Sequence, residues 1–176
     1  MSGLLINPNN EFPLNHVPLR TFAQFVHSKG NWDARKAYLS AMREWLAHFE
    51  TIREPSTLED LVLFGDCYYL PHDEGPEVEA WLASQTTFVK QAKRLRDFCA
   101  RLNELRDRSL FYALSRRAWE LREELDLLIG YFEHRGGDAS RYHSDSHLPG
   151  TFRGGTVARL QRLLTQQPDG TFIRTR

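Results

Sequence analysis

The chain of 176 residues is 41% hydrophobic and 26% charged, a composition that is typical of a folded globular protein and excludes a disordered or fibrous one. Lysine plus arginine (23) balance aspartate plus glutamate (23), so the basic excess of a nucleic-acid-binding protein is missing. No secretion signal opens the sequence, and no run of about eighteen apolar residues occurs that would span a membrane. We therefore expect a soluble, cytoplasmic protein with neither nucleic acid nor a membrane as a partner.

The first element is a short apolar run at residues 3–6 that stops at Asn7-Pro8, the pattern of a buried strand ending in a polar turn. A single strand has no ladder partner for its backbone N–H and C=O groups. We therefore interpret this strand as part of a sheet that the rest of the sequence lacks.

Two amphipathic helices are predicted next. Pro18 suits the first turn of a helix that ends at Gly30, and Asn31 is the expected N-cap of a second helix that runs to about residue 49. The residues predicted to be buried are Leu19, Phe22 and Phe25 in the first helix and Tyr38, Ala41, Trp45 and Phe49 in the second.

A third helix is predicted to begin with a capping box formed by Ser56 and Glu59 and to end before Pro71. A long helix follows, in which the apolar face includes Phe88, Ala92, Leu95, Cys99 and Leu102. Cys67 and Cys99 are too few for a disulfide framework and lack CxxC spacing, so we expect two reduced core residues.

The clearest pattern is an apolar seam with gaps of three and four, as in an antiparallel bundle or a coiled coil. Residues 136–150 are rich in Gly, Ser, Asp and His and predict a loop before a last short helix. The predicted fold class is an all-α helical bundle. The seam residues are Phe111, Leu114, Ala118, Leu121, Leu125, Leu128 and Phe132, and the last helix holds Val157, Leu160, Leu163 and Leu164.

Two groups of side chains have the residue types of a metal site or a catalytic site. His143, Asp145 and His147 have the residue types of a zinc site, but no helix presents them, so no metal is expected. Paired carboxylates can share acid and base roles. Each pair has a simpler explanation, because Glu59-Asp60 begins a helix, Asp73-Glu74 lies in a turn and Glu123-Glu124 faces solvent beside arginines.

Trp119 is expected on the outer side of the seam helix. It lies about 100° around the helix from Ala118, on the same stripe as Tyr112 and Asp126. Two interpretations stay open: a partner binds this tryptophan, or another helix of the same chain covers it.

Three stretches match one known family in their order and spacing. They are Asn7-Pro8-Asn9-Asn10-Glu11-Phe12, then Thr57-Leu58-Glu59-Asp60-Leu61 with Tyr69-Leu70-Pro71, and Phe152-Arg153-Gly154-Gly155 with Gln161-Arg162-Leu163-Leu164. With these stretches and the long helix around Trp119, the chain resembles the stalk region of the O-GlcNAcases, hydrolases of glycoside hydrolase family 84, over nearly its whole length.

The resemblance implies a (β/α)8 barrel with two adjacent catalytic aspartates, followed by a helical stalk through which two subunits pair. It also implies that the sugar's own 2-acetamido group attacks the anomeric carbon, with one aspartate orienting that group and the other serving as acid and base. This sequence contains no Asp-Asp dipeptide. Residues 1–15 are therefore expected to be a remnant of the last barrel strand and its loop, and residues 16–176 the helical stalk domain.

Site residues follow from the same resemblance. Asn7 matches an asparagine that hydrogen-bonds the bound N-acetylglucosamine, and Trp119 matches a stalk tryptophan that lines the substrate cleft of the partner subunit. Arg122 and Glu123 are expected to touch the peptide that carries the sugar. No catalytic residue, metal or cofactor is expected in this chain.

The first functional hypothesis is a non-catalytic stalk module of a protein O-GlcNAcase, which forms a homodimer and serves a catalytic barrel in cis or in trans. Its substrate would be an O-GlcNAc-modified peptide, and the chain alone would show no glycosidase activity. The alternative is a free-standing helical protein-protein interaction domain without a glycosidase link. A third hypothesis, a metal-dependent enzyme built on His143 and His147, predicts bound zinc or iron.

Overall fold

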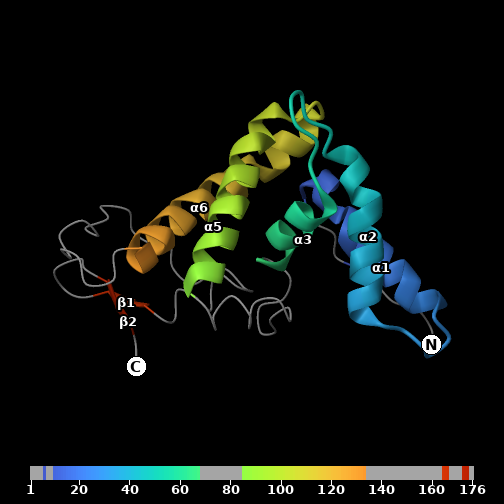
Figure 1. The fold of residues 1–176 in the computed structure, drawn as a ribbon. Helices are drawn as coiled ribbons and strands as arrows, with labels where there is room; N and C mark the ends of the chain where they lie inside the picture. Colours follow the sequence, from blue (N-terminus) through green and yellow to red (C-terminus); the bar gives the residue numbers. More distant parts are fainter. Residues whose placement is uncertain (1–5, 7–9, 68–84, 134–163, 167–171, 175–176) are drawn as a thin grey trace. The chain divides into compact units, whose positions relative to one another are not determined.

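The computed structural model describes residues 6, 10–67, 85–133, 164–166 and 172–174 (Figure 1). The described residues are mainly helical, so the predicted all-α fold class is confirmed, with one small two-stranded β-ladder added. They fall into two compact units. The first unit holds the described residues up to Val62 together with 101–118, and the second holds 63–100 together with those from Trp119 onward.

The first unit is built on two helices that lie side by side, α1 (His16–His27) and α2 (Ala34–Trp45) (Figure 1). A 3-10 turn, η1 (Phe12–Asn15), precedes α1, and another, η2 (Leu46–His48), follows α2. The apolar face of α2 is buried, which confirms the predicted period of this helix. Its buried residues are Ala37, Tyr38, Ala41, Met42 and Trp45, and Phe49 is buried just beyond η2.

Two details of this helix pair differ from the prediction. The N-cap of α2 is Asp33 rather than Asn31, because the Asp33 carboxylate accepts the backbone N–H of Lys36 at 2.8 Å. The expected burial of Leu19 and Phe25 in α1 is wrong, because both side chains are exposed. The ring of Phe25 meets that of Trp32 edge to face at 5.2 Å, and Trp32 is itself exposed, so this end of α1 stays in contact with solvent.

Helix α3 (Leu58–Asp66) has its N-cap one residue later than the predicted capping box. The Thr57 hydroxyl, rather than that of Ser56, accepts the backbone N–H of Asp60. With Thr57 as the N-cap, the residue three positions further on is Asp60 rather than Glu59. The Asp60 carboxylate is buried, and the Arg101 guanidinium reaches it at 3.5 Å. The predicted helix is therefore present, with its cap shifted by one position.

A short backbone bridge precedes the long helix α6 (Arg108–Glu133). Thr51 pairs with Leu105, which follows the 3-10 turn η3 (Leu102–Glu104). The backbone N–H of Arg106 donates to the carbonyl of Glu50 at 2.9 Å. This pairing fixes the chain just before Asp107, whose carboxylate accepts the N–H of Leu110 at 3.0 Å and caps α6.

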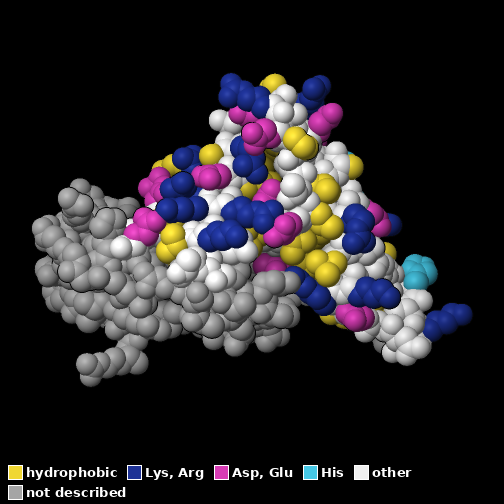
Figure 2. All heavy atoms as spheres, in the orientation of Figure 1, with side chains coloured by type: hydrophobic (Ala, Val, Ile, Leu, Met, Phe, Trp, Pro, Cys, Tyr) yellow, Lys and Arg dark blue, Asp and Glu magenta, His cyan; other side chains and the backbone are white. Residues whose placement is uncertain are grey.

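The second unit contains α5 (Gln85–Arg101) beside the later part of α6 (Figure 1). Lys93 pairs with Glu133 and Arg96 with Asp126, so two ion pairs join the helices. On the face drawn in Figure 2, basic and acidic side chains alternate over these helices. The core of this unit comprises Leu63, Phe64 and Cys67 near the end of α3, Phe88, Ala92, Leu95, Phe98 and Cys99 of α5, and Leu121, Leu125 and Ile129 of α6.

The predicted seam of α6 is confirmed at Leu114, Ala118, Leu121 and Leu125, all of which are buried. At its start the buried residue is Leu110 rather than Phe111, which is only half-buried. The Phe111 ring lies instead under the Arg108 guanidinium, 4.0 Å from the ring centroid. The side chains of Leu128 and Phe132 lie outside those that the structure describes.

The last described residues form β1 (Leu164–Gln166) and β2 (Phe172–Arg174), an antiparallel pair in which Thr165 lies opposite Ile173. The prediction of a helix through Leu164 is wrong at that residue. β-branched Thr165 and Ile173 favour a strand, and the sequence Pro168-Asp169-Gly170 has the composition of a turn.

Several predicted elements lie outside the described residues. They include residues 3–5 of the N-terminal strand, the turn that holds Asp73-Glu74, the loop at 136–150 and residues 157–163 of the last helix. Ile6 is described and has no regular secondary structure. The division into residues 1–15 and 16–176 stays a prediction.

Candidate functional site

Trp119 lies on the outer side of α6 with 60% of its surface exposed, which is the orientation that helical spacing predicts. The seam residues Ala118 and Leu121 are buried, so the Trp119 indole points away from the buried seam of α6. Tyr112 of the same helix is also exposed, at 70%. Large exposed aromatic side chains are typical of contact surfaces, so Trp119 is the first candidate for a binding residue.

The two other residues expected near Trp119, Arg122 and Glu123, differ in their exposure to solvent. Glu123, one turn further along α6, is exposed. Arg122 is half-buried, and its Nε atom is buried without a hydrogen-bond partner among the described residues. Its positive charge acts on the Cys99 thiol of α5, so the guanidinium lies toward the interior of the second unit. Of these three residues, Trp119 and Glu123 are therefore exposed to solvent, whereas Arg122 is half-buried.

Glu124 corrects one prediction, because this carboxylate is buried while its neighbour Glu123 faces solvent. Helical spacing explains the difference: Glu124 lies three residues after Leu121, on the seam side of α6. Its negative charge acts on the Cys67 thiol. The pair Glu123-Glu124 thus faces two different environments and cannot share one proton as a catalytic pair.

Both cysteines are buried free thiols, as the sequence predicted. Burial raises the pKa of Cys67 well above its ordinary value, and the nearby Cys99, Asp66 and Glu124 add to this shift. Burial also raises the pKa of Cys99 to about 12, although Arg122 opposes the shift. A thiol that stays protonated is a poor nucleophile, so neither cysteine has the character of a catalytic residue.

Other sequence candidates lie outside the described residues. They are Asn7, His143, Asp145 and His147, together with Asp73-Glu74. Within residues 10–67 and 85–133, no group of three His, Cys, Asp or Glu side chains is arranged to hold a metal ion. Of the helices described, none is long and apolar enough to cross a lipid bilayer.

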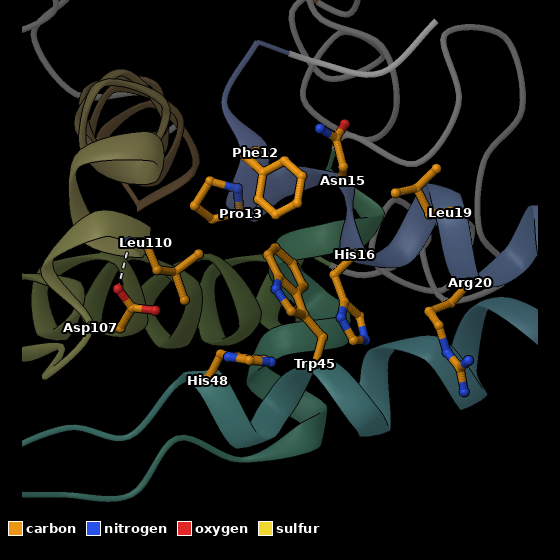
Figure 3. A pocket seen from close by; sticks show the side chains of 10 residues that line it. All are labelled: Phe12, Pro13, Asn15, His16, Leu19, Arg20, Trp45, His48, Asp107 and Leu110. Atoms are coloured by element: carbon orange, nitrogen blue, oxygen red, sulfur yellow. Dashed lines mark hydrogen bonds between the residues drawn. The ribbon is translucent and has the colours of Figure 1, made fainter. Parts of the chain in front are cut away.

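A pocket in the first unit was not predicted from the sequence. It has a volume of about 390 Å³ and is formed where η1, the start of α1, the end of α2 and the start of α6 meet (Figure 3). No local signal could have revealed it, because its walls come from three segments far apart in the chain. The lining residues are Phe12, Pro13, Asn15, His16, Leu19, Arg20, Trp45, His48, Asp107 and Leu110.

Comparison with known proteins relates the chain to the O-GlcNAcases. No protein-family model matches it. It is similar to the protein O-GlcNAcase of Rattus norvegicus and to that of Mus musculus, with 26% identity in each case. The similarity covers 63% of this chain and 16% of each relative, so the chain spans only a small part of the curated relatives that it matches.

Proposed function

We propose that this chain is a non-catalytic stalk module of a protein O-GlcNAcase of glycoside hydrolase family 84. In this proposal two copies pair as a homodimer in the cytoplasm, and each copy lends Trp119 to a cleft that holds the O-GlcNAc-modified peptide. Glu123 contacts the peptide beside Trp119, and Arg122 supports the same helix from its half-buried position. Asn7 hydrogen-bonds the sugar when a catalytic barrel is joined in cis or supplied in trans.

The exposure of Trp119 is the observation that carries this proposal. An indole with 60% of its surface exposed leaves a large apolar area in water, and covering it on binding is favourable. Glu123 follows Trp119 by one helical turn, so a partner that covers the indole also meets a carboxylate. The similarity to the O-GlcNAcases of rat and mouse, over 63% of this chain, supports the assignment to that enzyme class.

The chemistry of the described side chains supports a scaffold rather than a hydrolase. Glu124 is buried on the seam side of α6, while Glu123 faces solvent. The two thiols are held protonated by burial. In this proposal these groups have structural roles in the helices, and the groups that break the glycosidic bond belong to the catalytic barrel.

The proposal is tested by supplying the barrel domain of a protein O-GlcNAcase in trans and measuring kcat/KM for a glycosylated peptide. We expect the full chain to raise kcat/KM, and Trp119→Ala to lower the gain by roughly tenfold, as for an aromatic interface anchor. Trp32→Ala is the matched control, because Trp32 is an exposed tryptophan of the first unit. Equal losses for both variants would contradict the assignment of Trp119.

Two measurements on the chain alone complete this test. With a chromogenic N-acetylglucosaminide it should give no turnover above buffer, and clear hydrolysis would overturn the proposal. In sedimentation equilibrium the chain should populate a dimer, and a strict monomer at high concentration would contradict the pairing.

The alternative function, a free-standing protein-protein interaction domain, uses the same exposed Trp119 and Tyr112. It predicts that the chain neither binds nor stimulates the barrel. The barrel experiment therefore separates the two functions.

A further inference from the structure

His16 lies at the contact between α1 and α2 in the first unit. It is the first residue of α1, and its side chain is half-buried. Figure 3 shows the His16 ring reaching from α1 toward α2, between Trp45 and Arg20. The two helices pack against each other, so a change of charge on this ring acts at their contact.

One ring nitrogen of His16 is closed off from water. Its Nε2 atom is buried and has no hydrogen-bond partner within the described part of the chain. In a neutral imidazole this nitrogen can be without a proton, whereas in the charged form both ring nitrogens are N–H donors. A buried donor of a charged ring is costly when neither water nor a protein acceptor solvates it. The folded arrangement therefore favours the neutral ring.

The charges around His16 add to this preference. The His48 ring of η2 lies 5.7 Å from the His16 ring, so two protonated imidazoles would repel each other. Arg20 of α1 acts in the same direction. The Glu44 carboxylate of α2 favours a charged ring, but it already accepts the Nε–H of Arg20 at 2.6 Å. Asp107, which lines the same pocket, is engaged as the N-cap of α6.

The position of His16 in its helix also disfavours a positive charge. The N-terminus of a helix is the positive end of its macrodipole, and His16 begins α1, whereas His27 ends it. Burial is the largest cause that lowers the pKa of His16 from the ordinary value of 6.5, and His48 lowers it further. With α1 packed on α2, the His16 ring is therefore mainly neutral at pH 7.

We propose that His16 is a pH-sensitive switch, which docks the start of α1 on α2 when its ring is neutral and releases it when the ring is protonated. In the released state both ring nitrogens can donate to water. The docked state binds fewer protons than the released one. Docking is therefore strongest above the ordinary pKa of 6.5 and weakens as the pH falls through the lowered pKa of His16. The switch goes beyond the proposed stalk function and does not involve Trp119.

The test is hydrogen exchange of the full chain at about pH 7.5 and about pH 5.5, corrected for the intrinsic pH dependence of amide exchange. Both values lie above the ordinary glutamate pKa of 4.5, and that of Glu44 is lower still, so the Arg20–Glu44 ion pair persists in both. We expect the protection of α1 amides to fall roughly threefold or more at the lower pH. Helix α5 is the internal reference, because residues 85–133 contain no histidine. Unchanged protection of α1, or an equal fall in α5, would overturn the proposal.

A variant pair assigns the effect to His16. His16→Phe keeps a ring at this position and removes the titrating group, so α1 should have the same protection at both pH values. His27→Phe is the matched control and should leave the fall unchanged, since His27 is an exposed histidine at the opposite end of the same helix. If folded His16→Phe lost as much protection at the lower pH as the original chain, the switch would be wrong.

A measurement on the original chain covers the case in which His16→Phe does not fold. The carbon-bound protons of each histidine ring shift in the NMR spectrum when the ring gains a proton. We expect the His16 signal to titrate below the ordinary value of 6.5, and titration at or above this value would contradict the proposal. Failure of the switch would leave the stalk proposal standing, because the barrel experiment depends on Trp119 and not on His16.

Discussion

The hydroxyl group of Thr57 donates a hydrogen bond to the carboxylate of Asp60 at 2.7 Å, and the Thr57 hydroxyl oxygen also accepts the backbone N–H of Asp60 at 3.1 Å. The Arg101 guanidinium lies 3.5 Å from this carboxylate. The start of α3 is thus joined to the end of α5 through one buried acid. A helix cap that also anchors an ion pair has a larger structural role than a cap in solvent.

We expect Thr57→Ala to lower the free energy of unfolding by about 1 kcal/mol, because α3 loses its cap and Asp60 loses a donor. Ser56→Ala is the matched control, since the Ser56 hydroxyl has no hydrogen-bond partner among the described residues. Urea unfolding followed by circular dichroism measures both. A larger loss for Ser56→Ala would place the cap where the sequence alone suggested it.

The buried seam of α6 predicts a strong contrast between neighbouring positions. Leu121→Ala should cost about 2–5 kcal/mol, because it opens a cavity beside fully buried neighbours. Glu123→Ala, two residues away on the exposed side, should change stability by less than about 0.5 kcal/mol. Comparable costs in denaturant unfolding would show that the seam faces another direction.

The raised pKa of Cys99 predicts a loss of stability at high pH. The folded chain keeps this thiol protonated up to a pKa of about 12, whereas the unfolded chain releases the proton near the ordinary value of 9.0. The unfolded state therefore binds fewer protons between pH 9 and 12, and stability falls as the pH rises through this window. Cys99→Ala should make the fall of unfolding free energy with pH less steep. An unchanged slope would mean that Cys99 ionises equally in both states.

Burial of the two thiols also predicts slow modification. Cys67 and Cys99 should react with a thiol reagent in the folded chain far more slowly than in denaturant, because burial limits access and keeps the reactive thiolate scarce. Absorbance at the reagent's product band follows both reactions. Fast labelling of the native chain would contradict the buried placement.

The ion pair of Arg20 and Glu44 should stabilise the packing of α1 on α2 in a salt-dependent manner. The hydrogen bond from Arg20 lowers the pKa of Glu44, so the stabilisation is present at pH 7 and is lost as the pH falls through the lowered value. Glu44→Gln should lower the melting temperature in low salt, with a smaller effect at 1 M salt. Glu50→Gln is the control, because Glu50 and Arg106 are 3.9 Å apart and more exposed.

The sequence by itself determined which segments are helical and which side of each helix is apolar. The period of α2 and the seam from Leu114 to Leu125 were readable, because the repeat of an α-helix fixes which residues share a face. The same spacing placed Trp119 on the outside of α6. These features depend only on backbone geometry within one segment.

The tertiary structure decided which residues pack against each face of each helix. The burial of Asp60 beside Arg101, for example, brings together residues of two different helices. The pocket around His16 and Trp45 requires segments separated by many residues to meet, and no local period encodes such a meeting. Long-range packing therefore set the burial of individual acids and the shape of the pocket, while local periodicity set the helices.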